Sequence, residues 1–394
     1  MQADRSPPRL LTLVAIAGLA ALTMNIFLPS LTSISAWYGA DYALAQLAIS
    51  AYLAATAVLQ IIIGPLSDRF GRRPVMLGGI VIFILASIGC LIAPGIYSFL
   101  AFRMIQATIA TGMVLSRAII RDMVEPSEAA SMIGYVTMGM SLAPMIGPAI
   151  GGWLDHLIGW QASFIILLVC GFGVLALVWV DLGETNRHPT PSFAAQFRAY
   201  PELIRSRRFW GYTLTATFSA GVFFSFLGGA PFVAETLFGL TPASSGMYFA
   251  LVSIGYMFGN FLSGRFSQSI GFNQMMIYGA TTSIVGVIIS LGLFSSGIIH
   301  PLSLYLPMLV VAVGNGLTLP NANAGIVSVR PQLAGSASGL GGAVNIAGGA
   351  GIAAITGAMM SDGTGIWPLL GMMGLSSLFA ILSANIVMRL APRG

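Results

Sequence analysis

Long stretches without any charged residue constrain this chain more than any other feature of its sequence. Residues 42–67 contain no Asp, Glu, Lys or Arg, and residues 74–102 contain none either. A helix needs about 20 apolar residues to cross the hydrocarbon core of a bilayer. Only 7% of the 394 residues are charged, whereas a soluble globular domain carries about 25%. We therefore expect an all-α membrane protein.

Counting the uncharged stretches predicts twelve transmembrane helices. They are expected within residues 10–40, 42–67, 74–116 (two helices), 129–154, 156–180, 209–234, 236–264, 266–329 (two helices), 331–361 and 363–388. A polar interval divides them into an N-terminal six-helix bundle (1–182), a cytoplasmic linker with an amphipathic helix (183–208) and a C-terminal six-helix bundle (209–394). Because prolines interrupt the amphipathic pattern, a disordered linker is the alternative for the interval.

The basic residues predict the orientation of these helices. All 17 of them are Arg, and most fall in alternate loops and at the two ends of the chain. The loops between them carry Asp41, Asp155, Glu235 and Asp362 but no Arg. Because basic loops stay on the cytoplasmic side of a membrane, both termini are expected in the cytoplasm of a bacterial cell, with the chain crossing the inner membrane many times. The net charge of +5 is then a topology signal, and no nucleic-acid partner is expected.

The absence of Lys excludes several chemistries. A phosphate-binding Walker loop and a Schiff base both need a lysine, so we expect neither an ATPase nor an enzyme of that kind. The three His residues are isolated near predicted helix ends, and Cys90 and Cys170 lie in apolar stretches. We therefore expect no metal site, no disulfide framework and no cofactor.

The two halves of the chain are related in sequence. The pattern Gly64-x-x-x-Asp68-x-x-Gly71 recurs as Gly264-x-x-x-Gln268-x-x-Gly271, 200 positions later and without a gap. Parallel repeats related by an axis along the membrane normal are a common transporter architecture, with the binding site near the bilayer midplane. The repeat therefore favours a transporter.

The short charged hinge after the second helix carries the first family resemblance. It contains Gly64, Asp68, Arg69, Gly71, Arg72 and Arg73 in the order Gly-x-x-x-Asp-Arg-x-Gly-Arg-Arg. This pattern resembles the loop between helices 2 and 3 of the major facilitator superfamily, and the resemblance implies a gating role and two six-helix bundles. The alternative is a basic loop that only sets topology.

The fifth helix resembles the antiporter motif of drug exporters in the same superfamily. Its matching positions are Gly134, Gly147, Pro148, Gly151 and Gly152, and Ala143 replaces a family Gly. Small residues let another helix approach closely, and Pro144 and Pro148 bend a helix, which suits a hinge or a tight seam. Ordinary small-residue packing is the alternative.

The fourth predicted helix indicates which subgroup of the superfamily this chain resembles. Arg103-x-x-Gln106 is similar to the superfamily's fourth-helix pattern, which implies that Arg103 faces the central cavity and serves proton coupling or substrate binding. The segment from Arg117 to Asp122 resembles the bicyclomycin and chloramphenicol resistance exporters, which implies that Arg117 or Arg121 pairs with Asp68 near the start of helix 11. Snorkelling of Arg117 to the headgroups is the alternative.

Leu28-Pro29-Ser30-Leu31 fits the same subgroup, but Asn25 and Phe27 stand where that subgroup has Asp and Tyr. Asn cannot titrate, so proton coupling is implied by the resemblance and has no carboxylate at this position to carry it. Further candidates for the cavity are aromatic, Met and Asn side chains, because pockets combine apolar walls with a few polar groups. They are Tyr52, Met113, Tyr135, Met138, Phe223, Phe224, Tyr248, Tyr256, Asn315 and Asn345.

Taken with the resemblance, these features predict a monomeric efflux transporter that exports small hydrophobic drugs, of the phenicol or bicyclomycin type, by alternating access. The proton gradient is the expected energy source. One alternative is an uncoupled or differently coupled exporter of an endogenous metabolite. The other is a membrane-embedded ligand sensor, against which stands the lack of a fused signalling domain.

Overall fold

The computed structural model describes residues 8–140, 142–186, 201–240, 242–360 and 365–390. The regular structure within these ranges is helical, with no strand. Ten helical stretches of the described chain are long and apolar enough to span a bilayer. The two remaining predicted spans correspond to the consecutive helices α7 (Pro126–Met140) and α8 (Leu142–Ile158), and to α12 (Pro242–Ile270).

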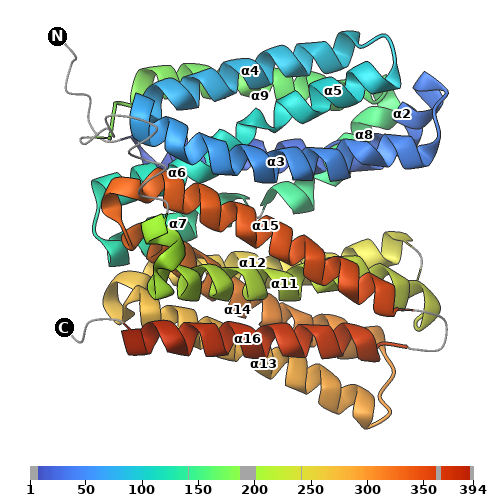
Figure 1. Cartoon of the computed structure of the whole chain (residues 1–394). Coiled ribbons are helices and arrows are strands. Elements are labelled where there is room, and N and C mark those ends of the chain that lie inside the picture. The colour runs from blue at the N-terminus through green and yellow to red at the C-terminus, as the bar shows by residue number, and fades with distance from the viewer. Residues whose placement is uncertain (1–7, 141, 187–200, 241, 361–364, 391–394) are drawn as a thin grey trace. The chain divides into compact units, whose positions relative to one another are not determined.

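The helices group into two compact units, each with a core of its own. The first unit contains residues 1–124, 139–201 and 330–343. Its helices are α1 (Leu10–Asn25), η1 (Leu28–Ser30), α2 (Leu31–Tyr38), α3 (Tyr42–Phe70), α4 (Arg72–Ile92), α5 (Ile96–Gln106), η2 (Ala107–Ile109), α6 (Ala110–Met123), α8, α9 (Gln161–Asp181), η3 (Pro331–Leu333) and the first turns of α15 (Ala334–Met359). In this unit α4 packs against α5 and α9 (Figure 1). Helix α1 packs against α6, α8 and α9.

The second unit contains residues 125–138, 202–329 and 344–394. Its helices are most of α7, α11 (Arg207–Thr236), α12, α13 (Phe272–Ser295), α14 (Pro301–Ser328), the rest of α15 and α16 (Trp367–Leu390). Here α14 packs against α11, α12 and α13, and α16 packs against α11 and α13. Apolar side chains such as Phe226, Tyr305 and Leu369 fill its core.

The units differ from two uninterrupted halves of the chain. Residues 125–138 belong to the second unit and residues 330–343 to the first, so α15 begins in one unit and continues in the other. The physical reason is close backbone packing through glycine, which is described below for α3 with α15 and for α7 with α12.

The hinge glycines have the same conformation in both sequence repeats. Gly71 ends α3 with φ 97°, and Gly271 follows α12 with φ 92°. Residues with a side chain rarely adopt such angles, so glycine allows one helix to stop and the next to start directly. The conserved spacing of the two repeats thus corresponds to the same helix–turn–helix geometry.

Helix boundaries extend beyond the uncharged stretches. The fourth predicted span continues as α6 to Met123, through Arg117, Arg121 and Asp122. Likewise α7 begins at Pro126, before Glu128. Charged residues are tolerated at helix ends because their side chains reach polar surroundings, so the loss of hydrophobicity marks the membrane boundary earlier than the helix boundary. The amphipathic helix predicted in the linker lies largely outside the described residues; residues 201–205 are helical.

Many large apolar side chains are exposed on the helix surfaces. Examples are Leu85, Val169, Ile288 and Leu306, each more than half exposed. A soluble protein rarely exposes apolar surface on this scale, whereas a membrane protein presents it to lipid.

Candidate functional site

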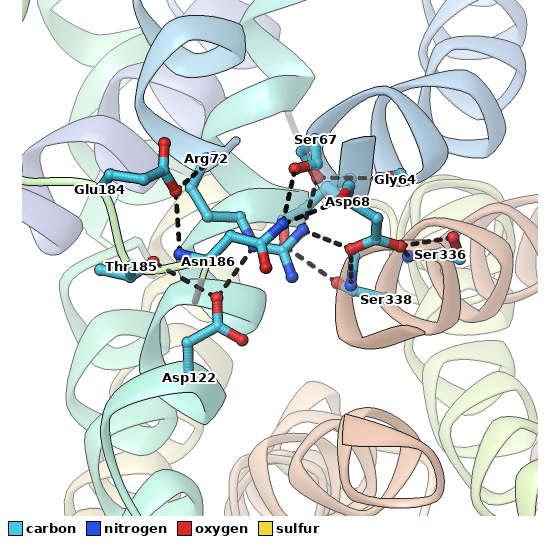
Figure 2. A network of polar contacts seen from close by, with 12 residues as sticks. Gly64, Ser67, Asp68, Arg72, Asp122, Glu184, Thr185, Asn186, Ser336 and Ser338 are labelled. Atoms are coloured by element: carbon cyan, nitrogen blue, oxygen red, sulfur yellow. Dashed lines mark hydrogen bonds and ion pairs between the residues drawn. The ribbon is translucent and has the colours of Figure 1, made fainter. Parts of the chain in front are cut away.

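Asp68, near the end of α3, is a buried carboxylate whose two oxygens are both hydrogen-bonded. Its side chain is 1% exposed. Oδ1 accepts from the backbone N–H of Gly335 at 3.1 Å, and Oδ2 accepts from the backbone N–H of Ser336 at 2.9 Å and from the Ser336 hydroxyl at 2.6 Å. Gly335 and Ser336 form the first turn of α15, where free N–H groups and the helix dipole favour an anion. Asp68 therefore caps α15 from another helix (Figure 2).

Arg72, four residues further along the chain at the start of α4, balances the charge of Asp68. Its Nη1 lies 2.5 Å from Asp68 Oδ1 and donates also to the Ser67 hydroxyl at 2.7 Å. Its Nε donates to Asp122 Oδ2 at the end of α6, at 2.9 Å. The guanidinium is 2% exposed. One arginine thus joins carboxylates from two helices, and the network combines α3, α4, α6 and α15 (Figure 2).

The chain leaving α9 closes this network. The Glu184 carboxylate accepts from the backbone N–H groups of Arg72 and Arg73, at 2.9 and 3.2 Å, and so caps the start of α4. Asn186 donates from its amide to the backbone carbonyl of Asp68 at 2.9 Å. A Cβ at Gly71 would collide with the Glu184 carboxylate, so the turn needs glycine for space as well as for its φ angle.

Glycines bring the backbones of α3 and α15 into contact beside Asp68. A Cβ added to Gly64 would lie 2.7 Å from the carbonyl carbon of Gly335. A Cβ added to Gly339 would overlap the backbone oxygen of Gln60. In addition, the Ser338 hydroxyl donates to the backbone oxygen of Val114 at 3.0 Å. The start of α15 therefore fits against α3 and α6 only because side chains are missing at these positions.

The other arginines of the predicted gating set have different neighbours. Arg73 donates to the backbone oxygen of Trp179 at 3.1 Å and lies over its ring. Arg69 lies over the Phe70 ring, and Arg121 donates to the backbone oxygen of Val124. The structure thus pairs Asp68 with Arg72, whereas Arg117 or Arg121 was the predicted partner. Arg117 is half-buried near Gly342.

Arg103, in α5 of the first unit, is a further buried charge. It is 1% exposed. Its guanidinium carbon lies 4.2 Å from the centre of the Phe27 ring and 4.0 Å from the centre of the Tyr52 ring. It donates to the backbone oxygen of Thr23 at 2.8 Å and to Gln106 Oε1 at 2.5 Å. Within the described residues no carboxylate pairs with it, so two aromatic faces and two neutral oxygens stabilise the cation.

The predicted residues Phe27, Tyr52, Arg103 and Gln106 are therefore brought together. Gln106 in turn donates to the Ser87 hydroxyl at 2.7 Å, which fixes the side chain that holds Arg103. The Nε–H of Arg103 has no partner among the described residues. A buried donor without a partner is costly, so Arg103 is a candidate functional residue.

Asn25 is the last residue of α1 and lies near this cluster in the sequence, but its side chain forms a hydrogen bond within α1. Its amide donates to the backbone oxygen of Ala21 at 2.7 Å. The motif glycines of α8 pack on this part of the chain: a Cβ at Gly151 would overlap the backbone oxygen of Ile26, and a Cβ at Gly147 would lie 3.6 Å from Asn25 Cβ. Gly152 faces Pro29 in the same way. Pro148 lies within α8, and the side chain of Pro144 is outside the described set.

Most of the remaining cavity candidates lie in the second unit. Phe223 stacks on Tyr256 with ring centres 6.0 Å apart, and Tyr248 stacks on Tyr305 at 4.9 Å. Asn315 is buried and accepts from the Ser219 hydroxyl at 2.7 Å, while its own amide nitrogen has no partner among the described residues. Phe224, Met138 and Asn345 belong to the same unit and are half-buried, whereas Met113, also half-buried, belongs to the first unit.

Gly134 and Tyr135 lie in a close contact between α7 and α12, whereas the sequence assigned Tyr135 to the cavity. A Cβ at Gly134 would lie 2.7 Å from the backbone nitrogen of Gly264 in α12. The ring of Tyr135 covers Gly264, and Ser131 donates to the Gly264 carbonyl. The hinge glycine of the second repeat thus packs on α7, as Gly64 packs on α15.

Some residues of the Asp68 network were not singled out from the sequence. Asp122 and Glu184 are acids just beyond apolar spans, next to an expected cluster of arginines, and this juxtaposition is the signal that points to them. The small pair Gly335-Ser336 follows Pro331 at a helix start, which is the pattern of an anion-binding N-terminus. Ser67, Ser87 and Thr23 give no such signal, because serine and threonine are common in membrane helices.

Comparison with known proteins identifies the family to which this chain is similar. A family model described as Major Facilitator Superfamily matches residues 13–354. A bicyclomycin resistance protein homolog of Haemophilus influenzae is 27% identical over 381 residues, covering 95% of this chain and 94% of its own. A chloramphenicol resistance protein of Pseudomonas aeruginosa is 29% identical over 273 residues, covering 69% of this chain and 65% of its own.

Solved structures agree on the fold. The transporter FucP in its outward conformation has a TM-score of 0.78 at 14% sequence identity, covering 96% of this chain and 98% of its own. The family match, the helical fold and the membrane-spanning helices together show that the chain belongs to the Major Facilitator Superfamily and is a multi-pass membrane transporter, not an enzyme.

Proposed function

We propose that this protein exports small hydrophobic drugs of the bicyclomycin or phenicol type across the bacterial inner membrane, as a monomer with both termini in the cytoplasm. The names of two relatives, a bicyclomycin resistance protein homolog and a chloramphenicol resistance protein, support this class of substrate. Aromatic and Met side chains, which adapt to varied apolar ligands, support it from the chain itself.

The observation that carries the mechanism is the bonding of Asp68 to the start of α15. Alternating access requires contacts that hold in one conformation and break in another. The Asp68 carboxylate joins α3 to a segment 267 positions away in sequence through three hydrogen bonds, and glycines leave no other side chain between the two backbones. We propose that this contact is the lock whose release lets the transporter change conformation.

We propose further that the proton gradient supplies the energy. Arg103 supports a coupling role because it is buried, positively charged and without a carboxylate partner among the described residues, so a nearby change in charge alters its free energy strongly. A site of this kind can exchange an anionic or polarised ligand group for its neutral oxygens.

The direct test is uptake of radiolabelled chloramphenicol and of bicyclomycin into cells with and without expression of the protein. Expressing cells should accumulate less drug, and collapse of the proton gradient with an ionophore should abolish the difference. The Asp68→Asn variant, inserted at equal level, should behave as cells without expression. Equal accumulation with and without the wild-type protein would contradict the proposed substrates.

A differently coupled exporter is the second candidate, and Asn25 favours it. The amide at this position bonds to Ala21 within α1 and does not gain or lose a proton at physiological pH. Under this alternative drug efflux continues after the proton gradient is collapsed but stops when a different ion gradient is removed. Introducing a carboxylate with Asn25→Asp should then create dependence on the proton gradient, whereas a protein already coupled to protons keeps it unchanged.

A further inference from the structure

A cavity of about 240 Å³ lies at one end of the antiparallel helices α11 and α16, within the second unit. Its lining includes the side chains of Arg205 and Arg207 and the apolar side chains of Leu214 and Ile386. Both arginines are exposed, and neither forms an ion pair or hydrogen bond within the described part of the chain. Two positive charges that have no partner among the described residues therefore line an apolar groove.

The groove lies at the level where a membrane helix meets the headgroups. Helix α11 begins at Arg207, and α16 ends at Leu390 with Arg389 in its last turn. Further along α16, Leu375, Phe379 and Leu382 are exposed, as expected for a surface in contact with acyl chains. The arginines thus lie beside the headgroup layer, and the apolar wall continues toward the lipid tails.

The groove is held in shape by the residues around it. The indole N–H of Trp210 donates to the backbone oxygen of Ile204 at 2.5 Å, which ties the turn carrying Arg205 to α11. Gly211 lets α11 approach α16, because a Cβ there would collide with Val387. Ser206 caps the start of α11 by accepting from the N–H of Phe209. Tryptophan at this position is typical of the membrane interface.

We propose that this groove binds an anionic glycerophospholipid, with its phosphate between Arg205 and Arg207 and one acyl chain against Leu214 and Ile386. Charge complementarity selects this occupant: guanidinium groups bind phosphate oxygens, and basic pockets between membrane helices bind anionic headgroups. A zwitterionic lipid brings its own cation to the same place, so it fits the two arginines less well. The inference does not depend on which substrate is transported.

Trp210 provides a direct probe of the site. The purified protein is reconstituted into phosphatidylcholine vesicles containing a small fraction of phosphatidylglycerol with brominated acyl chains, and tryptophan quenching is measured. Subtracting the signal of the Trp210→Phe variant isolates Trp210 from the five other tryptophans. Brominated phosphatidylglycerol should quench Trp210 at a lipid fraction roughly 30-fold below that needed for brominated phosphatidylcholine, since each arginine contributes roughly fivefold.

Matched variants test the role of the arginines. Arg205→Gln with Arg207→Gln should remove the preference for phosphatidylglycerol, Arg205→Lys with Arg207→Lys should retain most of it, and Arg265→Gln, at an exposed helix end outside the groove, should leave it unchanged. Equal quenching by both lipids in the wild type, or an unchanged preference in the double Gln variant, overturns the proposal. A change of Trp210 fluorescence on adding millimolar inorganic phosphate, without preferential quenching by brominated phosphatidylglycerol, also overturns it, because the groove then binds a free anion and no lipid.

Discussion

At the scale of single residues, the described part of the chain buries three charged side chains, Asp68, Arg72 and Arg103, and stabilises them by different means. Asp68 receives hydrogen bonds from two backbone N–H groups, a hydroxyl and Arg72. Arg103 lies between two aromatic rings and donates to neutral oxygens. The first arrangement is satisfied on every side, whereas the second leaves one donor without a partner. These two arrangements support the proposed gating role of Asp68 and the proposed role of Arg103 in binding a further group.

Replacing Asp68 by Asn should destabilise the protein and stop transport. Arg72 would keep Asp122 but lose its second carboxylate, and the start of α15 would lose its anionic cap. Removing one partner from a buried pair costs about 3 kcal/mol or more. Thermal unfolding in detergent measures the loss. Asp41→Asn is the control, since Asp41 is exposed and makes no side-chain cap bond, and its effect should stay within about 0.5 kcal/mol.

Arg103→Lys should impair transport although it keeps the positive charge. Lysine lacks the planar fork that reaches Thr23 and Gln106 together and stacks between Phe27 and Tyr52. Loss of one charge-assisted hydrogen bond, about 1.5 kcal/mol, lowers the transport rate roughly tenfold. Initial efflux rates at equal expression measure it, with the exposed Arg389→Lys as control. A variant that transports at the wild-type rate would show that only the charge at position 103 matters.

At the scale of helices, glycine allows particular pairs of helices to pack with their backbones in contact. Gly64 and Gly339 bring α3 and α15 together, and Gly134 brings α7 onto α12. Other glycines of α15 are different, because a Cβ at Gly351 or Gly357 would meet nothing within 4 Å. The same residue type thus forms a contact at one turn of a helix and an open surface three turns later.

This difference gives a paired test within one helix. Gly339→Ala places a methyl group on the Gln60 carbonyl, and the resulting separation of α3 from α15 should cost about 1–3 kcal/mol and weaken efflux. Gly351→Ala should be neutral or stabilising by up to about 1 kcal/mol, since alanine favours the helix. Unfolding temperature and efflux of the two variants provide the comparison. Equal behaviour would mean that the close approach at Gly339 has no energetic importance.

At the scale of the whole molecule, the arginine distribution predicts the orientation of every helix. Glu128 near the start of α7 and His156 near the end of α8 are both exposed and bracket the fifth predicted span. After Cys90 and Cys170 are replaced by Ser, a membrane-impermeant maleimide should label His156→Cys in intact cells and Glu128→Cys only after permeabilisation. The reverse pattern would invert the topology, and with it the proposed direction of export.

The helices could be predicted from the sequence because hydrophobicity and charge are properties of the individual residues and do not depend on tertiary contacts. The same holds for Asp68 and Arg103, since charges beside or within apolar stretches are conspicuous. The partners could not be predicted so well. Arg117 or Arg121 was expected to pair with Asp68, but Arg72, four residues after it, meets the carboxylate, and Arg121 donates to the backbone oxygen of Val124. Likewise Ser336 becomes a ligand of Asp68 only through a helix that begins 266 residues later.

That separation has a consequence for biosynthesis. Asp68 leaves the ribosome long before Gly335 and Ser336 have been translated, so its carboxylate must wait in the nascent protein with only local partners such as Arg72. The contact can form only after some two hundred and seventy further residues have been synthesised and α15 has entered the bilayer. A polypeptide that terminates before residue 334 keeps the acid but lacks its amide donors, so an unfinished transporter cannot form this contact.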